Sequence, residues 1–161
     1  MNHLEQLLYE YYDWQGYLVK RNIKVGRLLR GGWEGELDII AYHPIKNHLV
    51  HIESSIDADA WAVREIRFKR KFDCGKDYIF SEIFTWLDNT TPIEQIAVLI
   101  SHPKNRNTIG DGKIISIDEL IKDMRIMISS NGVMSKKAIP EQYSLLRTIQ
   151  LVTEGYIKRL A

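Results

Sequence analysis

The chain has one cysteine, no long apolar run and almost no net charge, and each shortage excludes a class of protein. Cys74 alone can form neither an intramolecular disulfide nor a multi-cysteine zinc site, which favours a reducing, intracellular setting. No apolar run reaches the length of about 18 residues that predicts a membrane span. Glu5, Glu10 and Asp13 interrupt the early apolar residues, so no leader segment is expected. We therefore expect a cytoplasmic protein without a membrane partner.

The net charge of +1 argues against a generally basic nucleic-acid coat protein, but the charge is unevenly distributed. Residues 20–30 carry five basic side chains and no acidic one, and residues 64–76 carry six against Glu65 and Asp73. Each basic segment taken alone is more often an ordinary solvated face than a binding surface. Their position on either side of the acidic motif described below makes them candidates for contacts with phosphates.

The length and composition predict one domain that spans residues 1–161. With 161 residues, 45% apolar and 27% charged, the chain is large enough to bury a core without disulfides or metals. No internal repeat, low-complexity tract or long linker divides it.

Apolar periodicity and turn residues predict an α/β fold, a mixed central β-sheet flanked by helices. Gly75 is expected to separate two helices, and Asp118 to cap the helix that follows it. The expected helices are residues 3–15, 58–73, 76–88, a segment from 118 and a C-terminal helix at about 140–160. The expected strands are residues 17–25, 35–42, 48–55, 93–101 and 113–117, of which the second and third form an antiparallel hairpin.

Two carboxylates stand at matching places in that hairpin, Asp38 on its first strand and Glu53 on its second. Strand alternation places Leu37 and Ile39 together on the face opposite Asp38, and places His51 on the face of Glu53. If the polar faces meet, the two carboxylates can bind one Mg²⁺, or Mn²⁺ in its place, because such ions prefer oxygen ligands and use few protein carboxylates. Without further matches, two exposed carboxylates on a solvated sheet face would be the more frequent explanation.

The order of short motifs strengthens the metal interpretation. Glu5 in a first helix precedes Gly16-Tyr17, then Gly35-Glu36-Leu37-Asp38, and then Ile52-Glu53 before another helix. This order resembles the PD-(D/E)XK, or restriction endonuclease-like, nuclease superfamily, and within it the small resolvase-like and Mrr-like members. The resemblance covers about residues 4–80 and, more loosely, the segments after residue 93. It implies a metal-dependent DNA endonuclease in which Asp38 and Glu53 ligate metal and Glu5 orients a ligand or binds a second ion.

One position departs from the family pattern, because the usual Glu-x-Lys is Glu53-Ser54-Ser55 in this chain. The family's lysine assists the nucleophilic water and offsets phosphate charge, and losing such a group is expected to cost about 10²–10³ in rate. Lys69 or Lys71 on the following helix can reach back over the site, and we rank Lys69 first. Ser55 can hold a water but cannot replace a cation. The alternative is a decayed site that keeps only a nucleic-acid-binding surface.

Three hypotheses follow, and DNA is the partner in two of them. The first is a Mg²⁺-dependent endonuclease that hydrolyses phosphodiester bonds, and the second is a non-catalytic DNA-binding relative. The third is a protein-interaction subunit that uses the C-terminal helix in a homodimer or larger assembly. The basic residues expected to contact phosphates flank the motif on both sides: Lys24, Arg27 and Arg30 before it, and Arg64, Arg67 and Lys71 after it.

Overall fold

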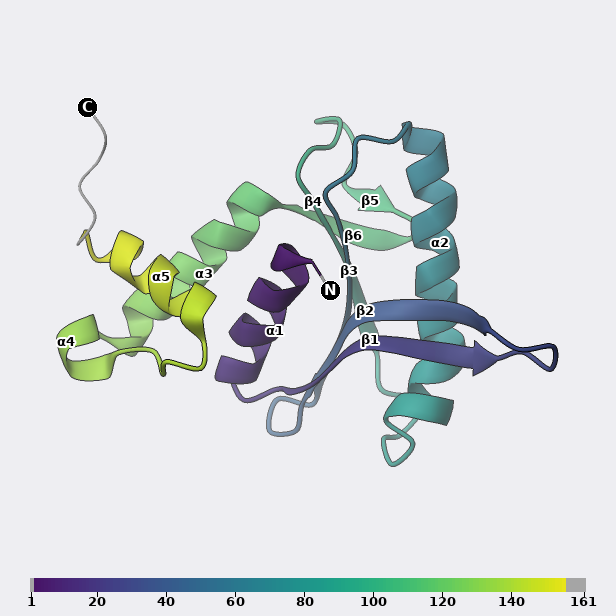
Figure 1. Cartoon of the computed structure of the whole chain (residues 1–161), viewed down its shortest axis with the longest axis horizontal. Coiled ribbons are helices and arrows are strands. Elements are labelled where there is room, and N and C mark those ends of the chain that lie inside the picture. The colour runs from purple at the N-terminus through teal and green to yellow at the C-terminus, as the bar shows by residue number, and fades with distance from the viewer. Residues whose placement is uncertain (1, 156–161) are drawn as a thin grey trace.

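A computed structural model describes residues 2–155 of the chain (Figure 1). The strands are β1 (Leu18–Arg27), β2 (Trp33–His43), β3 (His48–Ser55), β4 (Ile93–Leu99), β5 (Thr108–Ile109) and β6 (Gly112–Ser116). The helices are α1 (His3–Trp14), α2 (Trp61–Tyr78), α3 (Ile117–Asn131), α4 (Met134–Lys137) and α5 (Ser144–Thr153), with a π-helical turn, η1 (Ile79–Ile83), directly after α2.

The six strands form one mixed sheet in the order β1-β2-β3-β4-β6-β5. The first three strands are antiparallel neighbours, as the hairpin pattern predicts, whereas β3, β4 and β6 run parallel. Because β3 and β4 are parallel neighbours, the chain must cross over one face between them, and α2 makes this crossover. The predicted mixed sheet flanked by helices is confirmed.

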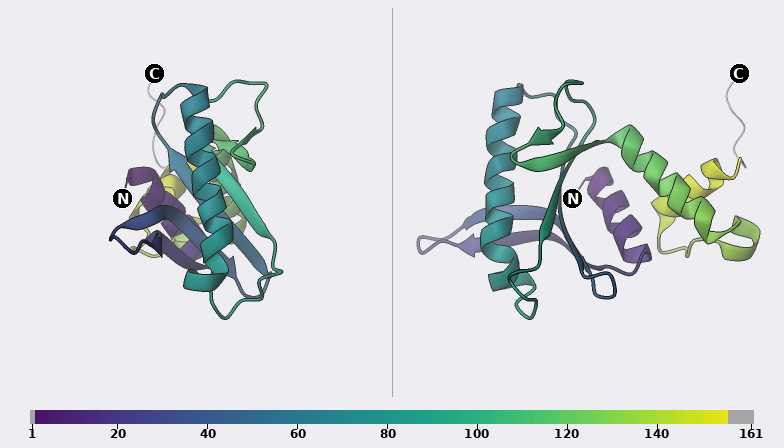
Figure 2. Two further views of the ribbon diagram at one scale, coloured as in Figure 1. Left: turned by 90° about the vertical axis from the view of Figure 1, so that its right-hand side faces the viewer. Right: turned by 180° about the vertical axis from the view of Figure 1, so that it is seen from behind.

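Helices cover both faces of the sheet (Figures 1 and 2). One face packs on α1 and α3, with α5 lying over both helices, and its core includes Leu8, Ile52 and Met124. The other face packs on α2 and η1, and its core includes Leu37 and Phe72. Within residues 2–155, no helix is long and apolar enough to cross a membrane.

The predicted helix break at Gly75 is wrong, because α2 runs through this residue without interruption. A Cβ built at Gly75 would lie 2.2 Å from Nδ1 of His51, so a larger residue would collide with the imidazole ring. Glycine is needed here for close approach of the helix to β3 rather than for a turn. The same contact brings α2 down onto the strand that carries Glu53.

The predicted side-chain alternation of β2 is also wrong on one side of Asp38. Ile39 packs on the α1 side of the sheet, but Leu37 packs on the α2 side, so two residues that should share a face lie on opposite faces. The register places Asn22 of β1 opposite Asp38, and Asn22 has a left-handed backbone, with φ of 50°. The phase of both strands changes at this point, because a left-handed residue interrupts the regular pleat.

Helices α3 and α5 begin at signals that the sequence analysis did not identify. The capping residue of α3 is Ser116, not the predicted Asp118, and it forms a capping box with Glu119. Helix α5 begins at Ser144 rather than near residue 140. In the first turn of this helix, the N–H groups of Leu145 and Leu146 donate hydrogen bonds to the buried carboxylate of Glu10. The predicted helix extends to about residue 160, and its last part lies outside the described residues.

Candidate functional site

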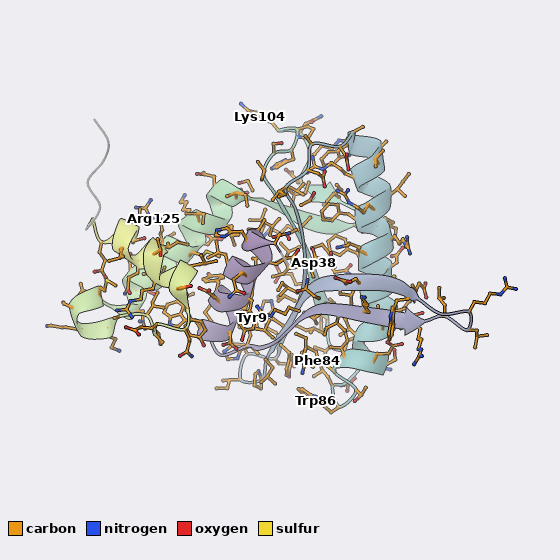
Figure 3. All side chains as sticks on the ribbon, in the orientation of Figure 1. Tyr9, Asp38, Phe84, Trp86, Lys104 and Arg125 are labelled. Atoms are coloured by element: carbon orange, nitrogen blue, oxygen red, sulfur yellow. The ribbon has the colours of Figure 1, made fainter. Side chains whose placement is uncertain are left out.

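The site forms where β2 and β3 separate. The last paired residues of the hairpin are Ile39 and Ile52, and Asp38 and Glu53 occupy the next position on each strand. Beyond this point β2 continues beside β1, whereas β3 continues beside β4, with Glu53 opposite Ala97. Figure 3 shows Asp38 near the centre of the molecule, between α1 and α2. The divergence of two strands therefore places two acidic side chains together at a gap in the sheet.

Each carboxylate has one oxygen held by the protein and one directed to a common point. Oδ2 of Asp38 accepts the N–H of Ser54 at 3.0 Å, and Oε1 of Glu53 accepts the N–H of Asp38 at 3.2 Å. The remaining oxygens, Oδ1 of Asp38 and Oε2 of Glu53, both accept hydrogen bonds from one ammonium group, that of Lys71. The bond to Asp38 measures 2.7 Å. Two strands and a helix thus converge on one cation position.

Burial controls the charges of these three groups. Burial and the neighbouring Glu53 carboxylate raise the pKa of Asp38 to about 6, against the opposing effect of the Lys71 ammonium. Burial likewise raises the pKa of Glu53. Burial alone would lower the pKa of Lys71, but the two carboxylates outweigh it and hold this pKa above its ordinary value. Lys71 therefore stays charged at neutral pH, and the fully ionised cluster carries one negative charge in excess.

His51 supports Glu53 from behind. Burial lowers the pKa of His51 to about 3, so its ring is neutral at neutral pH. Its Nε2 lies 2.8 Å from Oε1 of Glu53, and Nε2 must carry the proton if it is to donate to that oxygen. Nδ1 is then free to accept from the side-chain amide of Gln95, at 3.3 Å. Because His51 is fully buried, it holds a carboxylate in place and is not exposed to a phosphate.

Of the two lysines considered for the missing position, the structure brings Lys71 to the carboxylates and not Lys69. The ammonium of Lys69 lies 2.7 Å from Asp73 and 3.0 Å from Asp111, on the exposed side of α2. Ser55 makes its hydrogen bonds elsewhere: its hydroxyl donates to Asp57 and accepts from Arg67 at 3.2 Å. Ser55 is therefore part of a polar network with Asp57 and Arg67.

Glu5 lies beside the site, but within residues 2–155 its side chain makes no hydrogen bond or ion pair with Asp38 or Glu53. Its side chain accepts from the backbone N–H and the side-chain amide of Asn2, at 3.1 and 2.6 Å, and so closes the capping box of α1. It also accepts from Asn22 at 3.0 Å, the residue opposite Asp38 in the register. Within residues 2–155, Glu5 thus joins the start of α1 to the irregular point of β1, one strand away from Asp38.

A small cleft opens onto Glu53 and Lys71 and has a volume of about 210 Å³. Its wall combines the start of α1, the end of β3 and the middle of α2. The lining residues include Asn2, Glu53, Ser54, Arg67 and Lys71. The cleft thus combines two cations, Arg67 and Lys71, with two carboxylates, the buried Glu53 and Asp57, which pairs with Arg67. Lys71 and the bound cation proposed below would be the groups that hold an anion there.

The carboxylate oxygens of Asp38 and Glu53 can ligate a hard divalent ion at the position where they meet. Within residues 2–155, no group of three His, Cys, Asp or Glu side chains comes together to hold a metal. Oδ1 of Asp38 and Oε2 of Glu53 nevertheless meet at a position already occupied by the cationic end of Lys71. Mg²⁺ commonly takes one or two carboxylates and completes its octahedral shell with water, so this pair is sufficient in chemistry and number.

The basic residues expected to contact phosphates fall into two groups. Arg64 is buried and donates to the carbonyl of Ser101, and Arg67 pairs with Asp57 and Asp59. Lys71 lies within the carboxylate cluster. On the β1–β2 ribbon, by contrast, Lys24, Arg27 and Arg30 are exposed, and no hydrogen bond or ion pair holds them within the described part of the chain.

Comparison with protein-family models, with curated proteins and with solved structures returned no match to this chain. The interpretation of the site therefore depends on its geometry alone. Residue types could have identified Asp38, Glu53 and a lysine from the next helix, but not the supporting contacts from His51, Gln95 and the N–H of Ser54. Those contacts depend on how α2 packs on the sheet. The local signal for this packing is Gly75, which lets the helix approach His51 closely.

Proposed function

We propose that the chain is a metal-dependent phosphodiesterase acting on DNA, with a restriction endonuclease-like fold. The observation that carries this proposal is that the Lys71 ammonium donates hydrogen bonds to both Asp38 and Glu53. The resemblance leads one to expect a lysine at position 55, where this chain has Ser55. A lysine from the following helix thus supplies the charge that the strand lacks. Asp38 and Glu53 would hold Mg²⁺ or Mn²⁺, with Lys71 moving aside to face the substrate.

Electrostatics favours this assignment. When both carboxylates are ionised, they and the Lys71 ammonium together carry one excess negative charge, which attracts a divalent cation into the gap. Once a divalent ion is bound, the same cluster is net positive and attracts a phosphodiester. The bound ion would supply a water of lowered pKa and stabilise charge on the phosphate. Lys71 would donate to a non-bridging phosphate oxygen, while His51 and the N–H of Ser54 keep the carboxylates in position.

Cleavage assays on plasmid, linear and branched DNA in Mg²⁺ or Mn²⁺ test the proposal. Asp38→Asn and Glu53→Gln are expected to abolish cleavage, because each keeps the size of the side chain and removes a charged ligand. Asp73→Asn is the matched control, since Asp73 is an exposed carboxylate on α2 that pairs with Lys69. Equal activity in all four proteins would contradict the assignment.

A second candidate, a DNA-binding protein that does not cleave, is favoured by one observation. The Lys71 ammonium occupies the point where a metal would bind, so it can act as a permanent substitute for the ion. Calorimetric titration with Mn²⁺ separates the two functions. An active site binds Mn²⁺ in the wild type, whereas a site closed by Lys71 gains Mn²⁺ binding only in Lys71→Met.

A further inference from the structure

The β1–β2 ribbon projects beyond α2 (Figures 1 and 2). It ends in exposed apolar residues that lie between Arg27 and Arg30 or close to them. Its tip, residues 27–33, carries Leu29 at its turn, and this side chain is 107% exposed. Leu28 and Trp33 are also about half exposed. Leu28, Leu29 and Trp33 together leave apolar surface open to water at one end of the ribbon, which is a suitable contact surface for a partner.

The base of the ribbon is held firmly by α2, which makes the tip a supported projection. Arg70 donates to the carbonyl of Glu34 at 2.5 Å, and the Tyr78 hydroxyl donates to the carboxylate of Glu34. Gly26 has φ of 68°, and a Cβ there would lie 2.8 Å from the Tyr78 ring, so the helix packs directly on the backbone. Because the ribbon is already fixed as far as Gly26 and Glu34, presenting the tip to a ligand costs little conformational entropy.

The turn itself exposes two side chains of different chemistry. The N–H of Gly31 donates to the carbonyl of Leu28 at 3.0 Å, which places Leu29 and Arg30 at the two central positions of a β-turn. Gly31 and Gly32 have φ of 88° and 87°, left-handed values that close the turn and leave no side chain beyond Arg30. Leu29 is therefore the foremost apolar group of the ribbon, with an arginine directly after it.

The charge of the tip favours an anionic partner. The guanidinium groups of Arg27 and Arg30 have no hydrogen bond or ion pair within residues 2–155, and residues 27–33 contain no acidic side chain. The nearest acids lie toward the base: Glu34 is bound by Tyr78, and Glu36 stands opposite Lys24. An apolar residue between two free arginines matches a duplex groove, where arginines bind phosphates and an apolar side chain enters between base steps.

We propose that the ribbon tip is a DNA-deforming element in which Leu29 inserts between base pairs of a duplex while Arg27 and Arg30 bind the flanking phosphates. This inference takes DNA as substrate from the proposed function and specifies it further, as duplex with a flexible step or a branch rather than single strands. The tip leads directly into β2, the strand that carries Asp38, and Glu53 lies on the neighbouring strand β3. In this proposal a duplex held by the tip extends along the ribbon toward the cleft. Bending at the tip would bring the backbone toward Lys71 and the carboxylates.

The test uses the full chain and a short duplex that carries 2-aminopurine beside a TA step, in EDTA so that no cleavage occurs. The wild type is expected to raise the 2-aminopurine fluorescence, which reports unstacking. Leu29→Ser should lose most of this rise and bind about tenfold more weakly, as for the removal of a central apolar anchor. Leu29→Met should retain both, since methionine also serves as a wedge.

Two matched controls lie elsewhere on the surface. Ile45 is 91% exposed in the β2–β3 loop, so Ile45→Ser removes an equally exposed apolar group and should change neither signal. Arg125 lies on α3, on the other side of the molecule from the tip (Figure 3). Arg125→Ala should keep the wild-type salt dependence, whereas Arg27→Ala and Arg30→Ala should each reduce the salt slope by about one.

Four results would overturn the inference. The first is that the 2-aminopurine fluorescence does not change when the wild type binds, and the second is that Leu29→Ser behaves like the wild type. The third is that the protein binds anionic vesicles through Leu29 but does not bind DNA. The fourth is that Leu29 mediates self-association of the chain. Plasmid cleavage in Mg²⁺ is measured separately on the same proteins. If the wild type unstacks DNA but never cleaves it, the nuclease proposal is refuted and the proposed role of the tip is supported. If it cleaves DNA without unstacking it, only the proposed role of the tip is refuted.

Discussion

Helix α2 and the β1–β2 ribbon are both rich in basic residues, but the structure uses their charges in opposite ways. On α2, Arg67 pairs with Asp57 at 2.5 Å and Lys69 with Asp73 at 2.7 Å. Lys71 is bound between the two site carboxylates. On the ribbon, Arg27 and Arg30 have no such partner in the described residues. The helix uses its cations to organise the molecule, and the ribbon leaves its cations available.

The difference arises from what each element packs against. Helix α2 lies over the sheet and beside the loop that follows β3, so its long side chains reach acids on both. It also carries Asp73 four residues after Lys69, a spacing that pairs charges on one helix face. The ribbon tip projects past its supporting helix and meets no other element (Figure 2). Similar numbers of lysine and arginine in two segments, five in residues 20–30 and six in residues 64–76, therefore do not predict equal binding of phosphate.

The largest expected effect concerns Lys71, the α2 cation that contacts both site carboxylates. Lys71→Met should lower the rate of DNA cleavage by about 10²–10³, because the group that offsets phosphate charge is lost. Lys69→Met is the control, since it removes a lysine two positions away that is paired with Asp73 and Asp111. Single-turnover cleavage measures both. If both variants lose the same fraction of the cleavage rate, then the general positive charge of α2 matters, and the position of the Lys71 ammonium at the carboxylates does not.

A smaller effect is expected for stability at Arg64. Its buried guanidinium donates to the carbonyl of Ser101 and packs on Trp61, so Arg64→Met leaves that carbonyl without a donor. We expect the free energy of unfolding to fall by about 2 kcal/mol. Urea denaturation measures the change, and Arg27→Met on the exposed ribbon should leave the transition midpoint unchanged. If the two substitutions destabilise equally, the contrast between the helix and the ribbon does not hold.

The salt dependence of DNA binding should separate Arg30 from Arg67. Arg30→Ala is expected to reduce the slope of log affinity against log salt by about one, the value for one lost phosphate contact. Arg67→Ala should reduce it less, because Asp57 and Asp59 already neutralise this guanidinium. Fluorescence anisotropy over a series of salt concentrations gives both slopes. Equal slopes would show that ion pairing within the chain does not restrict Arg67.

The smallest effect should follow the loss of the exposed pair between Lys69 and Asp73. Lys69→Met is expected to leave the urea midpoint near the wild-type value, because an exposed ion pair contributes little to stability. It should also leave DNA affinity unchanged. A clear loss of affinity with an unchanged midpoint would identify Lys69 as a phosphate contact and would extend the binding surface from the ribbon onto α2.

Local patterns in the sequence predicted most of the framework. The hairpin, the two acidic positions and the face shared by His51 and Glu53 all follow from strand alternation, and Lys71 could be named as one of two candidates. Two long-range features could not be predicted. The left-handed Asn22 changes the phase of β1 and β2, and Gly75 serves close packing against His51 rather than a turn.

Side-chain partners were the least predictable part of the site. Lys69 and Lys71 are two positions apart on a helix, and only the placement of α2 on the sheet decides which one meets the carboxylates. The same holds for Arg64 and Arg67, which a sequence reader would group with the ribbon arginines. Their partners, Ser101 and Asp57, lie in loops whose position depends on tertiary packing.

Diffraction at the manganese absorption edge, from crystals grown with Mn²⁺, tests the central claim most directly. The proposed site predicts an anomalous peak bound by Oδ1 of Asp38 and Oε2 of Glu53, with the Lys71 ammonium displaced toward the cleft. A structure without a peak, in which Lys71 still lies between the two carboxylates, would contradict the metal-dependent function.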